Sequence, residues 1–369
     1  MRAVVVSDGK RGHEGQSRAL AELMGVPQPP VLTVRRPPPA GEPLLRLLSW
    51  FAAPAKWPAS LARGVPAQSF GEDALGTLQR SLEERKEEGP LLAISAGTLA
   101  AIPALLLAHR LGARTVHLMR PSLVPVRRFD LVVVPQHDVP RSAGSGVLTF
   151  PFALGFTGQE TLDRCREVLR SRLGLKPGQP MPEGPYLTVL VGGRSAHFSM
   201  EPKPLLAFAH ALAQLAEERS WRILLSTSRR TPEAVETALK QLQREHREAL
   251  YFAVWARLDS YNPLPAFFEL SQAVVLTEDS VSMISEAVLA GHRPLLLPMR
   301  RLRRDGKVAR FQRYLLDRKL ARRVGEVKEL APLLEDELSR PHRSREEVAT
   351  ELGLNELAAT IRSRLGLLL

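Results

Sequence analysis

The sequence predicts an α/β protein of two domains, each built on a doubly wound parallel sheet. The chain has 369 residues, which is more than one ordinary hydrophobic core supports. In both halves, apolar runs of strand length alternate with amphipathic segments of helical period, a pattern typical of parallel sheets covered by helices. A stretch rich in Pro and Gly separates the two halves. We expect an N-terminal domain at 1–173, a linker at 174–185, a C-terminal domain at 186–340 and helices at 341–369.

The charge balance points to an anionic partner. Lys and Arg number 51 against 39 Asp and Glu, a formal net charge of +12. A nucleotide, a phosphorylated lipid, an acidic membrane face or a nucleic acid would suit that charge. A general solubilising surface explains it equally well, because the basic residues are mixed with acidic ones on apparent helices.

The composition also excludes several classes of protein. Cys165 is the only cysteine, which excludes a disulfide framework and a cysteine-based zinc site. The first residues follow a strand pattern rather than a signal peptide, and no run reaches the roughly 20 apolar residues of a membrane span. We therefore expect a cytoplasmic protein, and contact with the inner membrane face stays open as an alternative.

The first apolar run, Ala3–Val6, leads into a polar loop, Ser7–Gln16, and then into an amphipathic helix. Three glycines stand in the loop at three-residue spacing, with basic and acidic side chains among them: Gly9, Gly12 and Gly15, with Asp8, Lys10, Arg11 and His13. A Gly-rich loop between a strand and a helix lets backbone N–H groups approach an oxyanion closely. The spacing is neither GxGxxG nor a P-loop. We predict a functional loop, with a polar surface loop as the alternative.

The Pro-rich region 27–69 contains a short apolar segment with two tryptophans, Trp50 and Trp57, among basic residues. Such a segment suits an interfacial helix at a membrane surface. A helix that packs on its own domain is the favoured interpretation.

Further polar loops follow the next apolar runs of the first half. Ser95–Thr98 follows the run Leu91–Ser95, and His137 and Asp138 follow Asp130–Pro135. Because the carboxyl ends of parallel strands meet at one edge of a sheet, we expect these loops to converge with Asp8–His13.

Two loops of the second half suit a phosphate. The run Leu187–Val191 precedes Gly192 and Gly193, which permit close approach of another group to the backbone. The next apolar run, Trp221–Leu225, precedes a loop with hydroxyl and guanidinium groups. That second loop contains Ser228, Arg229 and Arg230. Arginine forms charge-assisted hydrogen bonds with phosphate oxygens.

The stretch Ala273–Met299 predicts a βαβ unit whose helix begins after a polar turn that runs from Thr277 to Ser280. Glu286 lies six residues after Ser280, about 9 Å along the helix axis, and shares a face with Ser282. A pyrophosphate at the helix start and a ribose at Glu286 fit this geometry.

A basic cluster follows, between Arg300 and Arg313. It suits a phosphate or an acidic surface, or simply the polar face of a loop and helix. Without interleaved aromatic residues it does not favour RNA or DNA.

These motifs together resemble the mitochondrial-fission ELM1-like family, whose bacterial members are largely uncharacterised. The resemblance covers nearly the whole chain in order and rests on Ser7–Gln16, Val191–Gly193, Leu225–Pro232, Asn262–Pro263 and Thr277–Ala287. More distantly, the layout is similar to GT-B glycosyltransferases, above all the peptidoglycan transferase that adds N-acetylglucosamine to a lipid-linked acceptor. This resemblance implies two Rossmann-like domains that face each other across a cleft.

The same resemblance implies roles for individual residues. Gly12 and His13 are similar to the Gly-rich loop with a His that opens the N-terminal domain, although DGKRGH departs from a run of glycines. Ser280, Ser282 and Glu286 are similar to the donor-binding helix, and Gly192 and Gly193 to the interdomain loop. We therefore expect an inverting, metal-independent glycosyltransferase that binds a nucleotide-diphosphate sugar as donor substrate and needs no cofactor.

In this interpretation His13 or Asp8 is the catalytic base, and the acceptor is lipid-linked or close to a membrane. Gly9, Gly12, Gly192, Gly193, Ser228, Arg229, Arg230, Thr277, Ser280, Ser282 and Glu286 form the binding set. No nucleic acid is expected as a partner, and the sequence predicts no particular oligomeric state. Two alternatives remain open: a sugar-nucleotide 2-epimerase, for which Asp8, His13, His137 and Asp138 would supply acid–base groups, and a non-catalytic nucleotide-binding scaffold.

Overall fold

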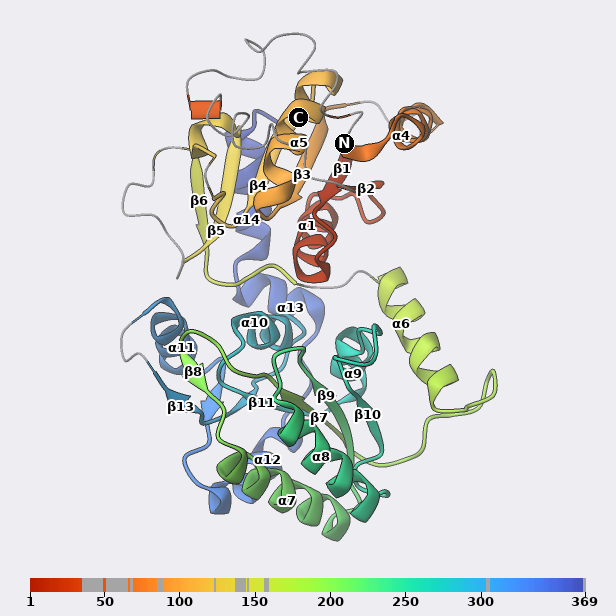
Figure 1. The fold of residues 1–369 in the computed structure, drawn as a ribbon, viewed down its shortest axis with the longest axis vertical. Helices are drawn as coiled ribbons and strands as arrows, with labels where there is room; N and C mark the ends of the chain where they lie inside the picture. The colour runs from red at the N-terminus through yellow and green to blue at the C-terminus, as the bar shows by residue number, and fades with distance from the viewer. Residues whose placement is uncertain are drawn as a thin grey trace. The chain divides into compact units, whose positions relative to one another are not determined.

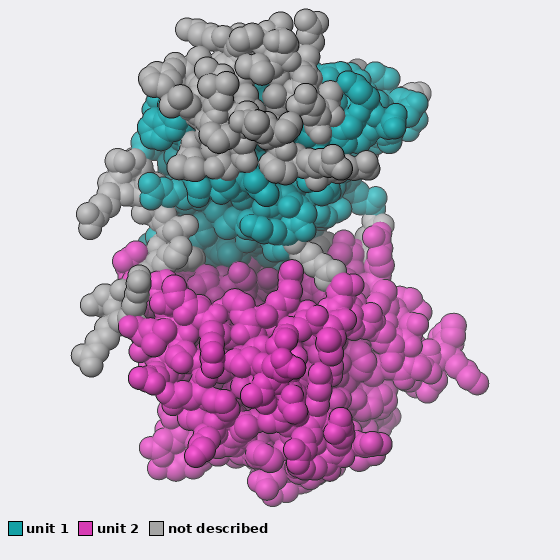
Figure 2. Space-filling view, viewed as in Figure 1, with its two compact units in different colours: residues 1–156, 352–369 teal, residues 157–351 magenta. Residues whose placement is uncertain are grey.

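The computed structural model describes residues 1–34, 49–50, 66, 69–84, 89–122, 124–136, 144, 146–155, 159–302 and 306–367. The chain forms two compact units (Figures 1 and 2). Unit 1 consists of Met1–Phe156 and Leu352–Leu369, and unit 2 consists of Thr157–Glu351. His137, Asp138, Trp57 and most of the Pro-rich region lie outside the described residues.

The two units differ from the predicted domain boundaries at both ends of the second half. Helix α6 (Gln159–Arg172) belongs to unit 2, where the guanidinium of Arg166 pairs with Glu269 of helix α9 (Leu264–Leu270). The Pro- and Gly-rich stretch therefore lies inside unit 2. Helix α14 (Leu354–Arg364) belongs to unit 1, where Nη1 of Arg364 donates to the carbonyl of Val147 at 3.0 Å.

Unit 1 contains a six-stranded sheet in which all neighbouring strands are parallel. In spatial order the strands are β2 (Val31–Thr33), β1 (Arg2–Ser7), β3 (Leu91–Ala96), β4 (Arg114–Leu118), β5 (Leu131–Pro135) and β6 (Val147–Phe150). The described helices are α1 (Arg11–Leu23), α4 (Glu72–Glu84), α5 (Thr98–Leu111) and α14. Helix α5 is apolar and buried from Ala100 to Ala108, and its side chains enter two core clusters. A helix that packs on both sides must be apolar all round, which explains its weak amphipathicity.

Unit 2 contains a second six-stranded sheet, again parallel throughout. In spatial order the strands are β10 (Phe252–Val254), β9 (Arg222–Thr227), β7 (Tyr186–Val191), β11 (Ala273–Thr277), β12 (Leu295–Leu297) and β14 (Arg322–Arg323). A short antiparallel pair joins β8 (Phe198–Ser199) to β13 (Arg300–Arg301). The remaining helices are α7 (Pro202–Glu218), α8 (Glu233–Glu245), α10 (Val281–Leu289), α11 (Lys307–Asp317), α12 (Leu330–Leu338) and α13 (Arg345–Glu351).

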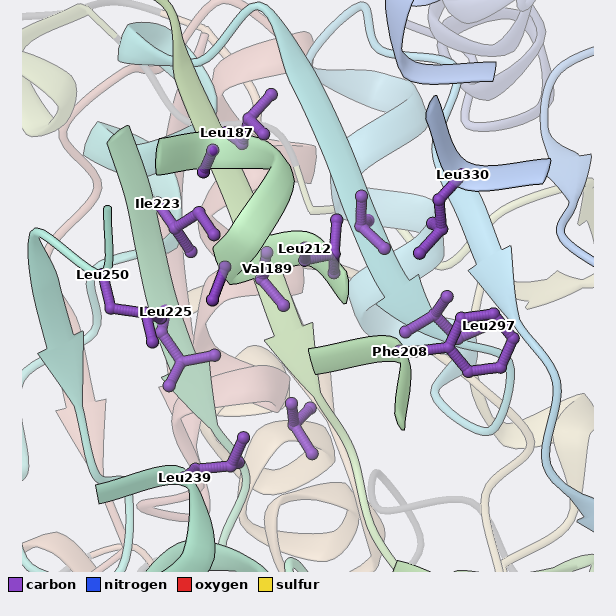
Figure 3. Close-up of a cluster of buried hydrophobic side chains, with 14 of the residues drawn as sticks. Leu187, Val189, Phe208, Leu212, Ile223, Leu225, Leu239, Leu250, Leu297 and Leu330 are labelled. Carbon is purple, nitrogen blue, oxygen red and sulfur yellow. The ribbon is translucent and has the colours of Figure 1, made fainter. Parts of the chain in front are cut away.

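Along the central strands of unit 2, successive side chains enter two different apolar clusters in alternation. Leu187 and Val189 of β7 and Leu225 of β9 join one apolar cluster with α7 and α8 (Figure 3). The alternate residues Tyr186 and Leu224 join a second cluster with α6 and α9. Both faces of the sheet are therefore covered, which is why its central strands are largely continuous apolar runs and do not alternate between apolar and polar residues.

The predicted α/β class is confirmed, with one six-stranded parallel sheet in each half of the chain. Every strand predicted from an apolar run is present, with ends shifted by a few residues. Within the described ranges, no helix has the length and apolar character that crossing a membrane requires.

Candidate functional site

The loop after β1 brings Asp8 and His13 together. Nδ1 of His13 lies 2.9 Å from Oδ2 of Asp8, and the backbone N–H of Lys10 donates to Oδ1 of the same carboxylate at 3.1 Å. The Asp8 side chain is fully buried, whereas that of His13 is 23% exposed. Asp8 therefore fixes the imidazole ring through Nδ1, and Nε2 is the nitrogen left for proton exchange. Of the two predicted bases, the geometry suits His13, with Asp8 as the group that orients it.

Gly97 allows the turn after β3 to approach this pair. Its φ is +84°, and a Cβ at this position would lie 2.3 Å from Nδ1 of His13 and 2.7 Å from Oδ2 of Asp8. No side chain fits there. Gly9 has a φ of +78° at the turn itself and donates its N–H to Oγ of Ser7, whereas a Cβ at Gly12 would meet open space. The predicted convergence of the first and second polar loops is thus present in unit 1.

A buried histidine that sequence reasoning missed lies beside this pair. Nδ1 of His117 on β4 is 2.8 Å from Oγ of Ser95 on β3, and its ring packs against Phe129. Burial, reinforced by the neighbouring His13 and opposed by Asp8, lowers the pKa of His117 to about 3. His117 is therefore neutral near pH 7. Its only sequence signal was a histidine inside an apolar run.

In unit 2, Gly192 and Gly193 admit a buried carboxylate that the prediction had not included in the site. The N–H of Gly192 donates to Oγ1 of Thr277 at 2.8 Å, and that of Gly193 donates to Oδ2 of Asp279 at 3.1 Å. A Cβ at Gly192 would lie 2.1 Å from Oδ1 of Asp279, and one at Gly193 would lie 2.1 Å from the carbonyl oxygen of Arg230. The two N–H groups expected to face a phosphate are therefore already used inside the protein.

The Asp279 carboxylate is fully buried and holds the next loop in place. It accepts a hydrogen bond from Oγ1 of Thr277 at 2.7 Å and pairs with Nη2 of Arg230 at 2.9 Å. Arg230 also donates to the carbonyl oxygen of Gly193 at 3.3 Å, and Oγ of Ser228 accepts its backbone N–H at 3.1 Å. This network ties β11 to the loop after β9.

The two neighbouring arginines therefore differ in what they can bind. Arg230 is committed to Asp279 and to backbone carbonyls. Arg229 is exposed, and its guanidinium has no partner among the described residues. Arg229 is the cation that remains available to an anionic ligand.

Helix α10 begins at Val281, directly after the polar turn, as predicted. The Ser280 side chain caps the helix by accepting the backbone N–H of Met283 at 3.4 Å, and Ser282 is exposed in the first turn. The first turn holds no acidic side chain, so the positive end of the helix dipole faces no opposing charge within its own turn.

Glu286 lies further along α10 and differs from the other buried carboxylates nearby. Its side chain is partly buried, and no described residue donates to its carboxylate. Burial alone raises the pKa of Glu286 to about 7. By contrast, Glu278 is fully buried but accepts from the Met299 N–H at 3.0 Å and from Arg301 and Arg323 at 2.9 and 3.0 Å.

An unpartnered, partly buried carboxylate on one helix face is costly for folding, so a ligand is a reasonable explanation for it. The predicted site residues of unit 2 thus separate into two groups. Hydrogen bonds or an ion pair within the protein already occupy Gly192, Gly193, Ser228, Arg230, Thr277 and Ser280. The side chains of Arg229, Ser282 and Glu286 are left for a ligand.

Part of the basic cluster after β12 is also paired. Arg300 lies 3.1 Å from Glu201, and Arg301 lies 2.9 Å from Glu278. In the Pro-rich region 27–69, Trp50 is half exposed and the guanidinium of Arg127 lies over its ring. Among the described residues, no three His, Cys, Asp or Glu side chains are placed to hold a metal ion.

Comparison with known proteins identifies relatives of this chain. A curated relative, the uncharacterized protein RP120 of Rickettsia prowazekii (strain Madrid E), is 23% identical over 231 residues. The match covers 56% of this chain and 64% of the relative, so the chain spans less than two thirds of that protein's length.

Several solved structures are similar over almost the whole chain at low identity. A UDP-GlcNAc 2-epimerase from Methanocaldococcus jannaschii is 10% identical, covering 98% of this chain and 100% of its own, with a TM-score of 0.49. A UDP-GlcNAc 2-epimerase from Neisseria meningitidis bound to UDP-GlcNAc is 14% identical, covering 99% of both chains, with a TM-score of 0.48. An α,α-trehalose-phosphate synthase (UDP-forming) from Burkholderia xenovorans is 13% identical, covering 99% and 100%, with a TM-score of 0.41.

The family comparison is more specific. The mitochondrial fission ELM1 family matches residues 11–354, which include His13, the two polar loops of unit 2 and helix α10. The predicted resemblance is confirmed. The chain belongs to the mitochondrial fission ELM1 family.

Proposed function

We propose that this chain is a glycosyltransferase that uses a nucleotide-diphosphate sugar as its donor, with the donor bound in unit 2. The observation that carries the proposal is Glu286, a partly buried carboxylate with no partner among the described residues. Two ribose hydroxyls of a nucleoside would donate to its two oxygens. That contact would supply the hydrogen bonds that the carboxylate lacks in the ligand-free protein.

The donor's diphosphate would bind at the start of α10. Backbone N–H groups of the first turn, near Ser280 and Ser282, face no acidic side chain of their own turn, and the helix dipole favours an anion there. Arg229, next to the Arg230 that pairs with Asp279, is exposed and has no described partner, and it would neutralise charge as the diphosphate leaves. No metal ion is needed for that stabilisation.

His13 of unit 1 would act as the general base. Its Nε2 would accept the proton of an acceptor hydroxyl as the hydroxyl oxygen forms a bond to the anomeric carbon of the sugar. The bond between that carbon and the diphosphate oxygen breaks, and its electron pair leaves with the nucleoside diphosphate. Asp8, hydrogen-bonded to Nδ1 at 2.9 Å, would stabilise the resulting imidazolium. The acceptor class stays as predicted, a lipid-linked or membrane-proximal hydroxyl.

A sugar-nucleotide 2-epimerase is the second candidate, because the Asp8–His13 pair would serve acid–base chemistry on a sugar as well. The two reactions differ in their need for an acceptor. Incubating the chain with UDP-, ADP- and GDP-sugars and no acceptor would release a C2-epimerised product only from an epimerase.

Calorimetric titration with the same nucleotide sugars tests the donor site. Glu286→Ala should weaken the binding of the sugar nucleotide that the wild type prefers at least tenfold, about 1.4 kcal/mol. Glu233→Ala, which removes an exposed carboxylate on α8, is the matched control and should leave binding unchanged. Equal affinities of the wild type and Glu286→Ala would remove Glu286 from the site.

A further inference from the structure

A cavity of about 580 Å³ lies at the edge of the unit 2 sheet, apart from the α10 site. Its wall comes from edge strand β14, from helix α12, from the end of α11 and from Arg293, which precedes β12. The volume lies within the range of about 300–1,000 Å³ that is usual for small-molecule sites.

The lining is strongly basic. Five cationic side chains line the cavity, against two carboxylates: Arg293, Lys319, Arg322, Arg323 and Arg340 face Glu329 and Asp336. Asp336 pairs with Arg322 and, at 2.9 Å, with Arg340. The Glu329 carboxylate accepts hydrogen bonds from the backbone N–H groups of Gly325 at 2.6 Å and Glu326 at 3.3 Å.

Two of the cations remain without an acidic partner in the part of the chain that the structure describes. Arg323 reaches out of the cavity to Glu278 at 3.0 Å, whereas Arg293 and Lys319 have no such contact. Like charges around one cavity repel each other and raise the local concentration of anions.

The open edge of β14 adds a backbone donor. The N–H groups of Arg322 and Val324 donate to the carbonyls of Pro294 and Leu296, both at 3.0 Å. Successive N–H groups of a strand point to opposite sides, so that of Arg323 faces the open edge, since β14 is the last strand of the sheet. Among the described residues, no acceptor meets it.

We propose that this cavity binds a phosphate monoester of a small organic group. Arg293 and Lys319 neutralise the phosphate, and the N–H of Arg323 donates to one of its oxygens. The organic part lies against the apolar side chains of Leu316 and Leu333, which line the same cavity. A soluble metabolite and a lipid headgroup share this chemistry, and the site is separate from the donor site of the proposed function.

The test uses the full chain and two probes that share one headgroup. Glycerol 3-phosphate is titrated by calorimetry, with glycerol as the neutral control. Vesicles of phosphatidic acid in phosphatidylcholine are co-sedimented with the protein, with phosphatidylcholine alone as the control. Binding of the free ester identifies a soluble source, and binding only to the acidic vesicles identifies a lipid source.

The double variant Arg293→Gln/Lys319→Gln should bind either probe at least tenfold more weakly than the wild type. Lys203→Gln/Arg247→Gln removes the same charges from exposed positions outside the cavity and should bind as the wild type does. Lys319→Gln alone, at an exposed position, should show part of the loss without a change in melting temperature. Glu286→Ala should leave binding of both probes to the cavity unchanged. This variant therefore distinguishes a failure of the proposed donor site from a failure of the proposed cavity site. Absence of binding to both probes, or equal loss in the two double variants, would overturn the proposal.

Discussion

The turns at the carboxyl ends of β1 and β11 are built alike, but the side chain that contacts the buried carboxylate differs. In unit 1 the buried carboxylate of Asp8 contacts His13, and in unit 2 the buried carboxylate of Asp279 contacts Arg230. In each unit a glycine of a neighbouring turn comes so close that its Cβ would collide with the carboxylate, at 2.7 Å for Gly97 and 2.1 Å for Gly192.

The difference between an imidazole and a guanidinium at this position agrees with the task proposed for each unit. An imidazole exchanges a proton near neutral pH, so a carboxylate that orients it suits general base catalysis. A guanidinium keeps its charge at all physiological pH values, so the Asp279–Arg230 pair is suited to shaping a loop and not to moving protons. In unit 2, burial raises the pKa of Glu286 to about 7, and its carboxylate has no partner among the described residues.

The largest expected effect comes from removing the imidazole of unit 1. His13→Ala should lower the rate of sugar transfer by about 10²–10⁴-fold, because general base catalysis supplies factors of that size. Binding of the nucleotide sugar should not change. His210→Ala, at an exposed position on α7, is the control. Transfer at the wild-type rate by His13→Ala would refute the division of tasks between the two units.

The next effect is on the stability of unit 2. The folded-state pKa of Glu286, about 7, is above its ordinary value of 4.5, so the folded chain keeps a proton that the unfolded chain has lost. Stability from this group is therefore full below about pH 4.5 and is lost as the pH rises through 7. Glu286→Gln should be more stable than the wild type at pH 8, by about 3 kcal/mol at most, and equally stable at pH 4. Denaturant unfolding at both pH values measures the difference, and equal stability at pH 8 would contradict it.

A smaller effect on stability should follow from adding a Cβ at Gly97, next to the Asp8–His13 pair. Gly97→Ala should destabilise the chain by about 2 kcal/mol, because the new Cβ meets both side chains at a positive φ. Gly112→Ala is the control for backbone strain, since it also has a positive φ, +63°, but a Cβ there meets nothing within 4 Å. It should cost about 1 kcal/mol. Thermal unfolding of both variants isolates the contact, and equal losses would argue against the close approach.

The smallest effects should separate the two arginines of the loop after β9. Arg229→Gln should weaken nucleotide-sugar binding several-fold and leave the melting temperature unchanged, because its side chain is exposed. Arg230→Gln should lower the stability by about 1 kcal/mol, because the buried Asp279 carboxylate loses its cation but keeps the hydrogen bonds from Thr277 and Gly193. If the two effects were exchanged, Arg230 would be the ligand-binding residue.

Much of the fold was predictable from the sequence, because buried strands are continuous apolar runs. The runs at Ala3–Val6, Leu187–Val191 and Ala273–Leu276 became β1, β7 and β11. Short strands such as β2 and β14 escaped prediction, since β14 consists of two arginines whose pairing with β12 depends on tertiary contacts.

The site was predictable at the level of loops but not of contacts. Glycine spacing pointed to the loop that holds His13, and the polar turn before α10 pointed to Ser280 and Glu286. Nothing in the local pattern distinguished Arg230, which pairs with Asp279, from Arg229 beside it, because their partners come from distant parts of the chain. The limits of the compact units differ from the predicted domain boundaries for the same reason: α14 belongs to unit 1 although it follows the whole of unit 2 in the sequence.

The most direct test of the donor site is the pH dependence of nucleotide-sugar binding. A sugar-linked diphosphate has no group that titrates between pH 6 and 8, so the change in affinity over this range reports on the protein. If ribose hydroxyls donate to the ionised Glu286, whose pKa is about 7, the wild type should bind about tenfold more weakly at pH 6 than at pH 8. Glu286→Gln should bind weakly at both pH values, with no such change. Equal affinity of the wild type at pH 6 and pH 8, or a pH dependence that survives in Glu286→Gln, would contradict a donor site at Glu286.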